Sequence, residues 1–150
     1  MSEFLTKSRA RNVFYGGSIF FVVVFVALTA QSHLHIVDKA TAGMPLTDEV
    51  VLGKHVWERN SCINCHTLHG EGAYFAPEVG NVMTRWGVAD DPEMAYEMLD
   101  GWMQAQPSGI DGRRQMPHFE ITEEEMRGLA EFLRWADQTD TQNWPPNDAG

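Results

Sequence analysis

The two cysteines of this 150-residue chain stand in one pentapeptide, Cys62-Ile63-Asn64-Cys65-His66. Two thiols three positions apart can each add to one of the two vinyl groups of a haem, and a histidine that follows directly is then held under the iron as an axial ligand. The pattern therefore predicts one haem c, attached covalently through Cys62 and Cys65, with His66 bound to the iron. Both cysteines are used in this way, so no disulfide is expected.

The same pair of cysteines is compatible with two other kinds of site. A zinc site would need two further Cys or His ligands at matching spacing. No second pair of this kind is formed by the remaining histidines, His33, His35, His55, His69 and His118. A thioredoxin-like dithiol would need a βαβ context, and the sequence has no strand pattern of useful length. Haem attachment is therefore the preferred interpretation.

A haem that carries electrons needs a sixth iron ligand, and a methionine thioether is typical because it raises the reduction potential. Among the eight methionines, Met116 is predicted to be this ligand, because Pro117 stiffens the irregular segment that holds it, residues 112–117. His118 is the alternative, since imidazole also binds iron well. Met83 would have to reach around from the side of His66. Core packing is expected for Met94, Met98, Met103 and Met126.

Three further residues are candidates to surround the haem. His66 should donate its second ring N–H to a backbone carbonyl, and Pro77, eleven residues later, is the candidate acceptor. Arg113 and Arg114 are candidates to neutralise the haem propionates. Solvated loop charges are an equally good interpretation of the two arginines.

The N-terminus combines basic residues with a long apolar run. Three basic residues within the segment 1–11 precede eighteen consecutive uncharged residues, 13–30, which as a helix would extend about 27 Å. This length nearly spans a bilayer, so residues 12–32 are predicted to be a transmembrane anchor behind a cytoplasmic basic N-terminus. The rest of the chain is then exported, as haem attachment also requires.

Two other interpretations of this segment are less favoured. A cleaved signal peptide would have a basic start and a small-residue site, here Ala30-Gln31-Ser32, but its apolar region is normally shorter, about 7 to 15 residues. A buried helix of a soluble protein would normally show a polar stripe, which is absent here. The membrane anchor is therefore preferred.

The exported part is predicted to be helical around a loop-rich middle. One helix should start at Thr47 and end near Asn60, and a second should run from Asp91 to about Met103. The last helix should start at Thr122, whose capping box precedes apolar residues at helical spacing. The predicted fold class is all-α, with a linker at 33–46, a haem domain at 47–138 and a tail at 139–150.

Charge is distributed unevenly along the chain. The whole sequence has a net charge of -10, but residues 38–150 alone carry 20 acidic and 8 basic side chains. Phosphates would be repelled from most of this surface, which argues against a nucleic-acid partner. An acidic haem domain instead favours a soluble electron donor with a basic face.

The order of these features resembles a membrane-anchored class I cytochrome c. Gly53 and Trp57 on the first helix of the domain, with Leu129 and Phe132 on the last, look like the crossing helix pair of that fold. More narrowly, several stretches resemble the cytochrome c subunits of bacterial nitric-oxide reductases: CINCHTLHGEGAYFAPE at 62–78, GNV at 80–82, GRRQMP at 112–117, LAEFLRW at 129–135 and the WPPN tail.

This resemblance implies an electron-entry subunit in the inner membrane, with its haem domain in the periplasm. Its partner would be a large multi-helix catalytic subunit that reduces two molecules of nitric oxide to nitrous oxide and water, and this chain would not bind the substrate. The resemblance alone also implies a calcium ion at the subunit interface, with the backbone carbonyl of Gly72 and the side chain of Tyr74 among its ligands.

Two other functions remain open at this point. A free-standing anchored carrier that docks on an oxidase would use the same haem and the same anchor. A haem gas sensor or a peroxidase-like enzyme would need an open sixth position on the iron, and would therefore bind carbon monoxide readily when reduced.

Overall fold

The computed structural model of the chain describes residues 6–41 and 44–141. It divides into two units, residues 1–40 and residues 41–150. The WPPN segment and most of the tail predicted at 139–150 lie outside the described residues, as does the start of the basic N-terminus.

The first unit is one long helix. α1, Lys7–His35, continues into a π-helical turn, η1, Ile36–Ala40. Together they are long and apolar enough to cross a membrane, and none of the apolar stretch is buried within the structure. The helix therefore extends beyond the anchor predicted at 12–32 and includes the first part of the predicted linker, 33–46.

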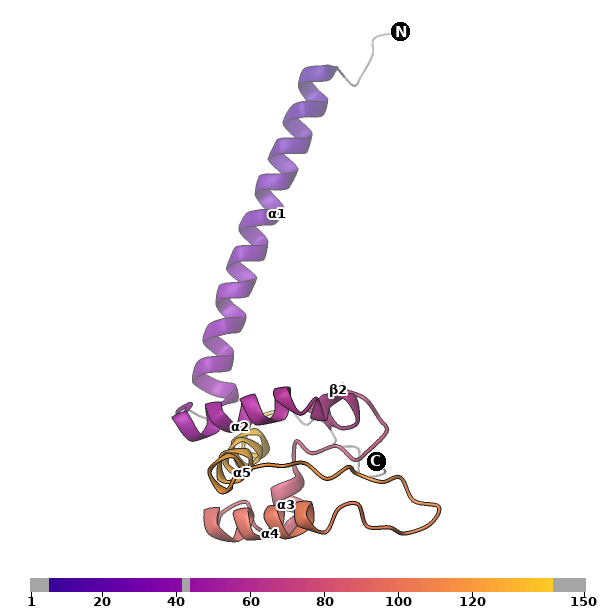
Figure 1. The fold of residues 1–150 in the computed structure, drawn as a ribbon. Helices are drawn as coiled ribbons and strands as arrows, with labels where there is room; N and C mark the ends of the chain where they lie inside the picture. The colour runs from indigo at the N-terminus through magenta and orange to yellow at the C-terminus, as the bar shows by residue number, and fades with distance from the viewer. Residues whose placement is uncertain (1–5, 42–43, 142–150) are drawn as a thin grey trace. The chain divides into compact units, whose positions relative to one another are not determined.

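Two crossing helices form the centre of the second unit (Figure 1). α2, Asp48–Arg59, starts at Thr47, whose side chain accepts the backbone N–H of Val50. α5, Glu123–Asp137, starts at the predicted capping box of Thr122. Both predicted helices are confirmed, because their caps and apolar periodicity are local features of the sequence.

The crossing of α2 and α5 depends on glycine. A β-carbon on Gly53 would lie 1.9 Å from the carbonyl oxygen of Gly128, so the two backbones are in direct contact. Next to this contact, the rings of Trp57 and Phe132 pack with their centroids 6.3 Å apart. The predicted helix pair is confirmed, whereas Gly128 was not among the residues predicted to form it.

Two more helices complete the packing around α5. α4, Pro92–Gln104, confirms the predicted middle helix, and α3, Val82–Trp86, was not predicted because five residues are too few to show a periodic pattern. α5 covers one face of α4, which buries Ala95, Leu99 and Met103. Met94 and Met98 lie on the face that α5 does not cover, so they are exposed, and their predicted core packing is wrong.

The haem motif lies in the irregular segment between α2 and α3. It begins with a 3-10 turn, η2, Cys62–Asn64, followed by two short strands, β1, Thr67–Leu68, and β2, Glu71–Gly72. The strands pair antiparallel, with Thr67 opposite Gly72. Since each strand has only two residues, the predicted all-α fold class is confirmed.

Candidate functional site

A tight turn brings the two cysteines and His66 together. Ser61 has a left-handed backbone, with φ at 55°, and the backbone N–H of His66 then donates to the carbonyl of Cys62 at 2.9 Å. Both cysteines are half-buried. Burial raises the pKa of the Cys62 thiol to about 11.

The segment after β2 runs back along the haem motif and supports it. Gly72 has a φ of 120°, and a β-carbon there would lie 2.4 Å from the carbonyl oxygen of His66, so only glycine fits. Three backbone hydrogen bonds join the two segments at 2.8 to 3.0 Å: Ala73 to Ile63, Ala76 to Cys65 and Val79 to Thr67. The turn that carries the cysteines is therefore backed by a second layer of backbone.

The same segment orients the His66 ring. Nδ1 of His66 lies 2.8 Å from the carbonyl oxygen of Pro77, so this nitrogen is the donor and Nε2 is the nitrogen that can bind iron. The ring of Trp57 lies beside the imidazole, with centroids 6.3 Å apart. Because Trp57 also contacts Phe132, the histidine is connected to the helix crossing.

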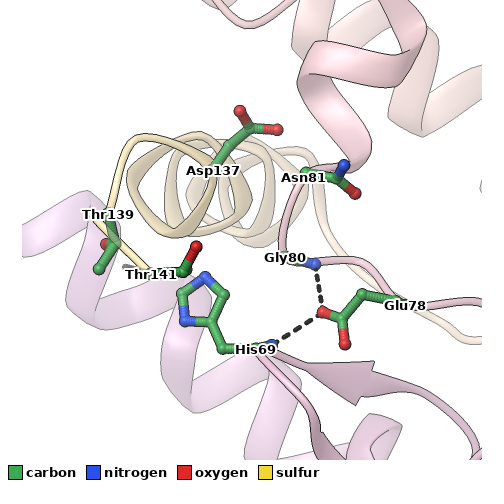
Figure 2. Close-up of a pocket in the computed structure, with 7 residues that line it drawn as sticks. All are labelled: His69, Glu78, Gly80, Asn81, Asp137, Thr139 and Thr141. Carbon is green, nitrogen blue, oxygen red and sulfur yellow. Dashed lines mark hydrogen bonds between the residues drawn. The ribbon is translucent and has the colours of Figure 1, made fainter. Parts of the chain in front are cut away.

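Glu78, which follows Pro77, forms a contact that was not predicted (Figure 2). Its carboxylate is buried and accepts the backbone N–H groups of His69, Gly70 and Gly80 at 2.8 to 3.0 Å. Burial alone would raise the pKa of Glu78, but the hydrogen bonds from Gly70, Gly80 and His69 outweigh it, so the pKa is below its ordinary value. The sequence does contain a signal for a buried carboxylate here, because Glu78 is the one acidic residue in the otherwise apolar stretch AYFAPEVG.

Met116 is half-buried and packs against the hydrophobic core. The side chain of Gln115 organises the loop beside it with four hydrogen bonds, to Ser108, Gly109, Ile110 and Arg113. Among the other methionines, Met83 is fully buried and Met126 nearly so. His118, the alternative iron ligand, is exposed.

The two arginines before Met116 differ in their contacts. Arg114 donates to the backbone carbonyls of Phe75 and, at 3.4 Å, Tyr74, and its guanidinium lies 4.9 Å from the centre of the Phe75 ring. It thereby joins the Met116 loop to the segment that supports His66. The Arg113 side chain is exposed. The propionate contacts expected of both arginines remain a prediction.

Gly72 and Tyr74, for which only the family resemblance implies calcium binding, lie in this same supporting segment and are exposed. Calcium takes six to eight oxygen ligands, roughly, so two from this chain do not make a complete site. Within residues 6–41 and 44–141, no group of three or more His, Cys, Asp or Glu side chains could hold a metal ion.

The donor set around the turn fits haem c. Two half-buried thiols stand three positions apart, and an imidazole has one nitrogen bound to a carbonyl and the other available for iron. A half-buried thioether, Met116, belongs to a loop that Arg114 joins to the same segment. Soft sulfur and imidazole ligands of this kind are those of electron-carrying haems.

The chain is similar to known proteins both in its second unit and over its full length. A family model described as cytochrome c matches residues 50–137. The chain is 79% identical to the C subunit of nitric oxide reductase from Cereibacter sphaeroides, 64% to that from Paracoccus denitrificans and 49% to that from Stutzerimonas stutzeri, and each alignment covers all of both chains. The chain therefore belongs to the cytochrome c family and, within it, to the C subunits of nitric oxide reductases.

Proposed function

We propose that Cys62 and Cys65 bind haem c covalently and that His66 and Met116 would be the two protein ligands of its iron. The bound haem supplies one-electron redox chemistry. The observation that carries the proposal is the hydrogen bond from His66 Nδ1 to the Pro77 carbonyl, which orients the ring and leaves Nε2 for the iron. Met116 would fill the sixth position and exclude other ligands.

The chain is a cytochrome c electron-transfer subunit of nitric oxide reductase, and we infer that it delivers electrons to the catalytic subunit of that enzyme. Reduction of two nitric oxide molecules to nitrous oxide and water consumes two electrons and two protons. Because His66 and Met116 would both bind the single haem iron, they would leave no vacant position for nitric oxide on this chain. The substrate would therefore react in the partner subunit.

We infer the direction of insertion from the basic residues at the N-terminal end of α1. Lys7, Arg9 and Arg11 precede the apolar stretch. Basic residues on one flank favour the cytoplasmic side, so the second unit would face the periplasm. There its acidic surface would attract a soluble donor with a basic face.

The calcium proposal concerns only the boundary with the partner. Gly72 and Tyr74 would supply two oxygens from the exposed segment that supports the haem turn, and the catalytic subunit would supply the rest. A chelator should then release calcium from the assembled complex, while the chain alone should bind none measurably. Calcium bound tightly by the solitary chain would contradict a shared site.

The central experiment is to purify the complex from native membranes through a tag on this chain. We expect a large catalytic subunit to copurify and the complex to reduce nitric oxide with a reduced donor. The solitary, haem-loaded chain should accept electrons and show no steady turnover. If no second polypeptide copurifies and the solitary chain reduces an oxidase, the free-standing carrier is the better interpretation; steady nitric oxide turnover by the solitary chain would contradict the proposal.

Topology needs a separate measurement. Protease added to spheroplasts should digest the second unit, residues 41–150, without opening the cells. Protection of this unit until the cells are lysed would show that the proposed orientation is wrong.

A further inference from the structure

Glu78 is a buried carboxylate that has no role in the electron transfer proposed above. Only 1% of the residue is exposed. Oε1 accepts the backbone N–H groups of His69 and Gly80, each at 2.8 Å (Figure 2). Oε2 accepts the backbone N–H of Gly70 at 3.0 Å. Backbone N–H donors that converge on a carboxylate favour its ionised form and fix its position.

These three donors lie at the two ends of one loop, residues 69–80, which Glu78 therefore closes. The loop is also held from outside, because Arg85 donates to the backbone carbonyl of Glu78 at 2.5 Å. There is little free space around the Glu78 carboxylate. A β-carbon on Gly80 would lie 2.8 Å from Oε1 of Glu78 and 2.5 Å from the His69 ring. A change in the Glu78 side chain would therefore displace the loop backbone.

Pro77, the residue next to Glu78 in this loop, provides the acceptor for His66. Its carbonyl oxygen lies 2.8 Å from Nδ1 of the imidazole. Proline has no backbone N–H, so Pro77 cannot donate any of the backbone hydrogen bonds that join this segment to the haem motif. The position of this carbonyl then depends on its neighbours, and Glu78 is the neighbour whose side chain is anchored.

We propose that Glu78 is a positioning residue for the haem iron: its carboxylate holds the Pro77 carbonyl in place and thereby sets the strength of the hydrogen bond from His66. This inference rests on the proposed function, because it requires His66 to be the iron ligand. A well-placed acceptor on Nδ1 makes the imidazole more basic and a stronger donor to iron. Stronger donation stabilises the oxidised iron, so Glu78 lowers the reduction potential.

The decisive variant is Glu78→Gln in the full haem-loaded chain. Glutamine has nearly the same shape, but its NH₂ group would face a backbone N–H, so at least one of the three hydrogen bonds is lost. We expect the Nδ1 proton of His66, followed by NMR, to exchange with solvent about tenfold faster, in line with a weakened hydrogen bond. The reduction potential should rise. Glu78→Asp, which keeps the charge, should fall between the wild type and Glu78→Gln in both measurements.

Glu71→Gln is the matched control, because Glu71 is an exposed acid of the same region and loses the same charge. It should leave the exchange of the His66 proton unchanged. Suppose that Glu78→Gln raises the reduction potential without changing the exchange of the His66 proton, and that Glu71→Gln raises the potential in the same way. The effect would then come from the lost charge alone, and the proposal would be overturned.

A measurement on the wild type keeps the proposal testable if Glu78→Gln does not fold. The backbone amides of His69, Gly70 and Gly80 should exchange slowly as a group, and rapid exchange of these three amides would overturn the proposal. The experimental result would be different if the proposed function itself were wrong. In that case the wild-type haem would lack a His66 ligand, whereas failure of this inference alone would leave haem attachment and His66 ligation intact.

Discussion

Gly53 and Gly128 hold the backbones of α2 and α5 in direct contact, since a β-carbon on Gly53 would lie 1.9 Å from the carbonyl oxygen of Gly128. Neither backbone can yield without separating the helices. We expect Gly53→Ala to lower the free energy of unfolding by about 2–4 kcal/mol, as overpacking against backbone does. Denaturant unfolding of the haem-loaded chain measures this loss.

Gly101 provides the control for this prediction. It lies in α4, and a β-carbon there would meet no atom within 4 Å. Gly101→Ala should be neutral or stabilising by about 0.5–1 kcal/mol, because alanine favours the helix. Equal effects of the two substitutions would show that the close approach of α2 and α5 is not what Gly53 provides.

Met116→Leu tests the sixth iron ligand. Haem should remain attached through Cys62 and Cys65, the thioether-to-iron charge-transfer band should disappear, and the reduction potential should fall, because a thioether favours reduced iron. Absorption spectroscopy and a redox titration measure both effects.

Met98→Leu is the control, since Met98 is exposed on α4, and it should change neither quantity. Replacement of the buried Met83 or Met126 should likewise leave the band in place. A bis-imidazole spectrum in the wild type would instead assign the sixth position to His118. Loss of the band on replacing Met83 or Met126, but not Met116, would also refute the assignment.

A pH-dependent contribution to stability is expected from Glu125. Its carboxylate accepts a 2.8 Å hydrogen bond from Arg59, which joins α5 to α2. This hydrogen bond, followed by the backbone N–H of Thr122, lowers the pKa of Glu125 to about 2 from its ordinary value of 4.5. Because the folded pKa is the lower one, the stabilisation is complete above about pH 4.5 and disappears as the pH falls through about 2.

Glu125→Gln should therefore destabilise the chain at pH 7 and have much less effect near pH 2. Unfolding curves across this range, compared with those of Glu124→Gln, an exposed neighbour in the same turn, measure the difference. A penalty for Glu125→Gln that does not change with pH would show that the ion pair is not its cause. Added salt should reduce the penalty, because the pair lies at the surface.

The charge of the haem domain predicts a salt-dependent reaction with its donor. Residues 38–150 carry 20 acidic and 8 basic side chains. Steering by opposite charge speeds encounter, so the second-order rate of electron transfer should fall on the order of tenfold between low and physiological ionic strength. Stopped-flow reduction of the complex measures this rate. A rate indifferent to salt would indicate that the acidity serves solubility alone.

Much of this molecule could be predicted from short stretches of sequence. The CxxCH pattern is a chemical signature within five residues, and the caps at Thr47 and Thr122 act within one helical turn. The apolar run of α1 is likewise local. Features of this kind depend on neighbours along the chain, so no knowledge of the fold is needed to find them.

Other features depend on which segments the fold brings together. Met94 and Met98 have the spacing of a core stripe, yet they are exposed because α5 covers a different face of α4. Helical periodicity shows which residues share a face, but not whether another element covers it. The five residues of α3 are too few to carry a period at all.

The sequence by itself determined the haem chemistry, the candidate ligands His66 and Met116, and the helices that frame them. The tertiary structure decided how these groups are held. Arg114 reaches carbonyls of Tyr74 and Phe75, about forty residues away in the chain, and Glu78 closes a loop through three backbone N–H groups. Nearly every residue has the same backbone N–H and C=O groups, so the sequence does not show which of them a given side chain will hydrogen-bond.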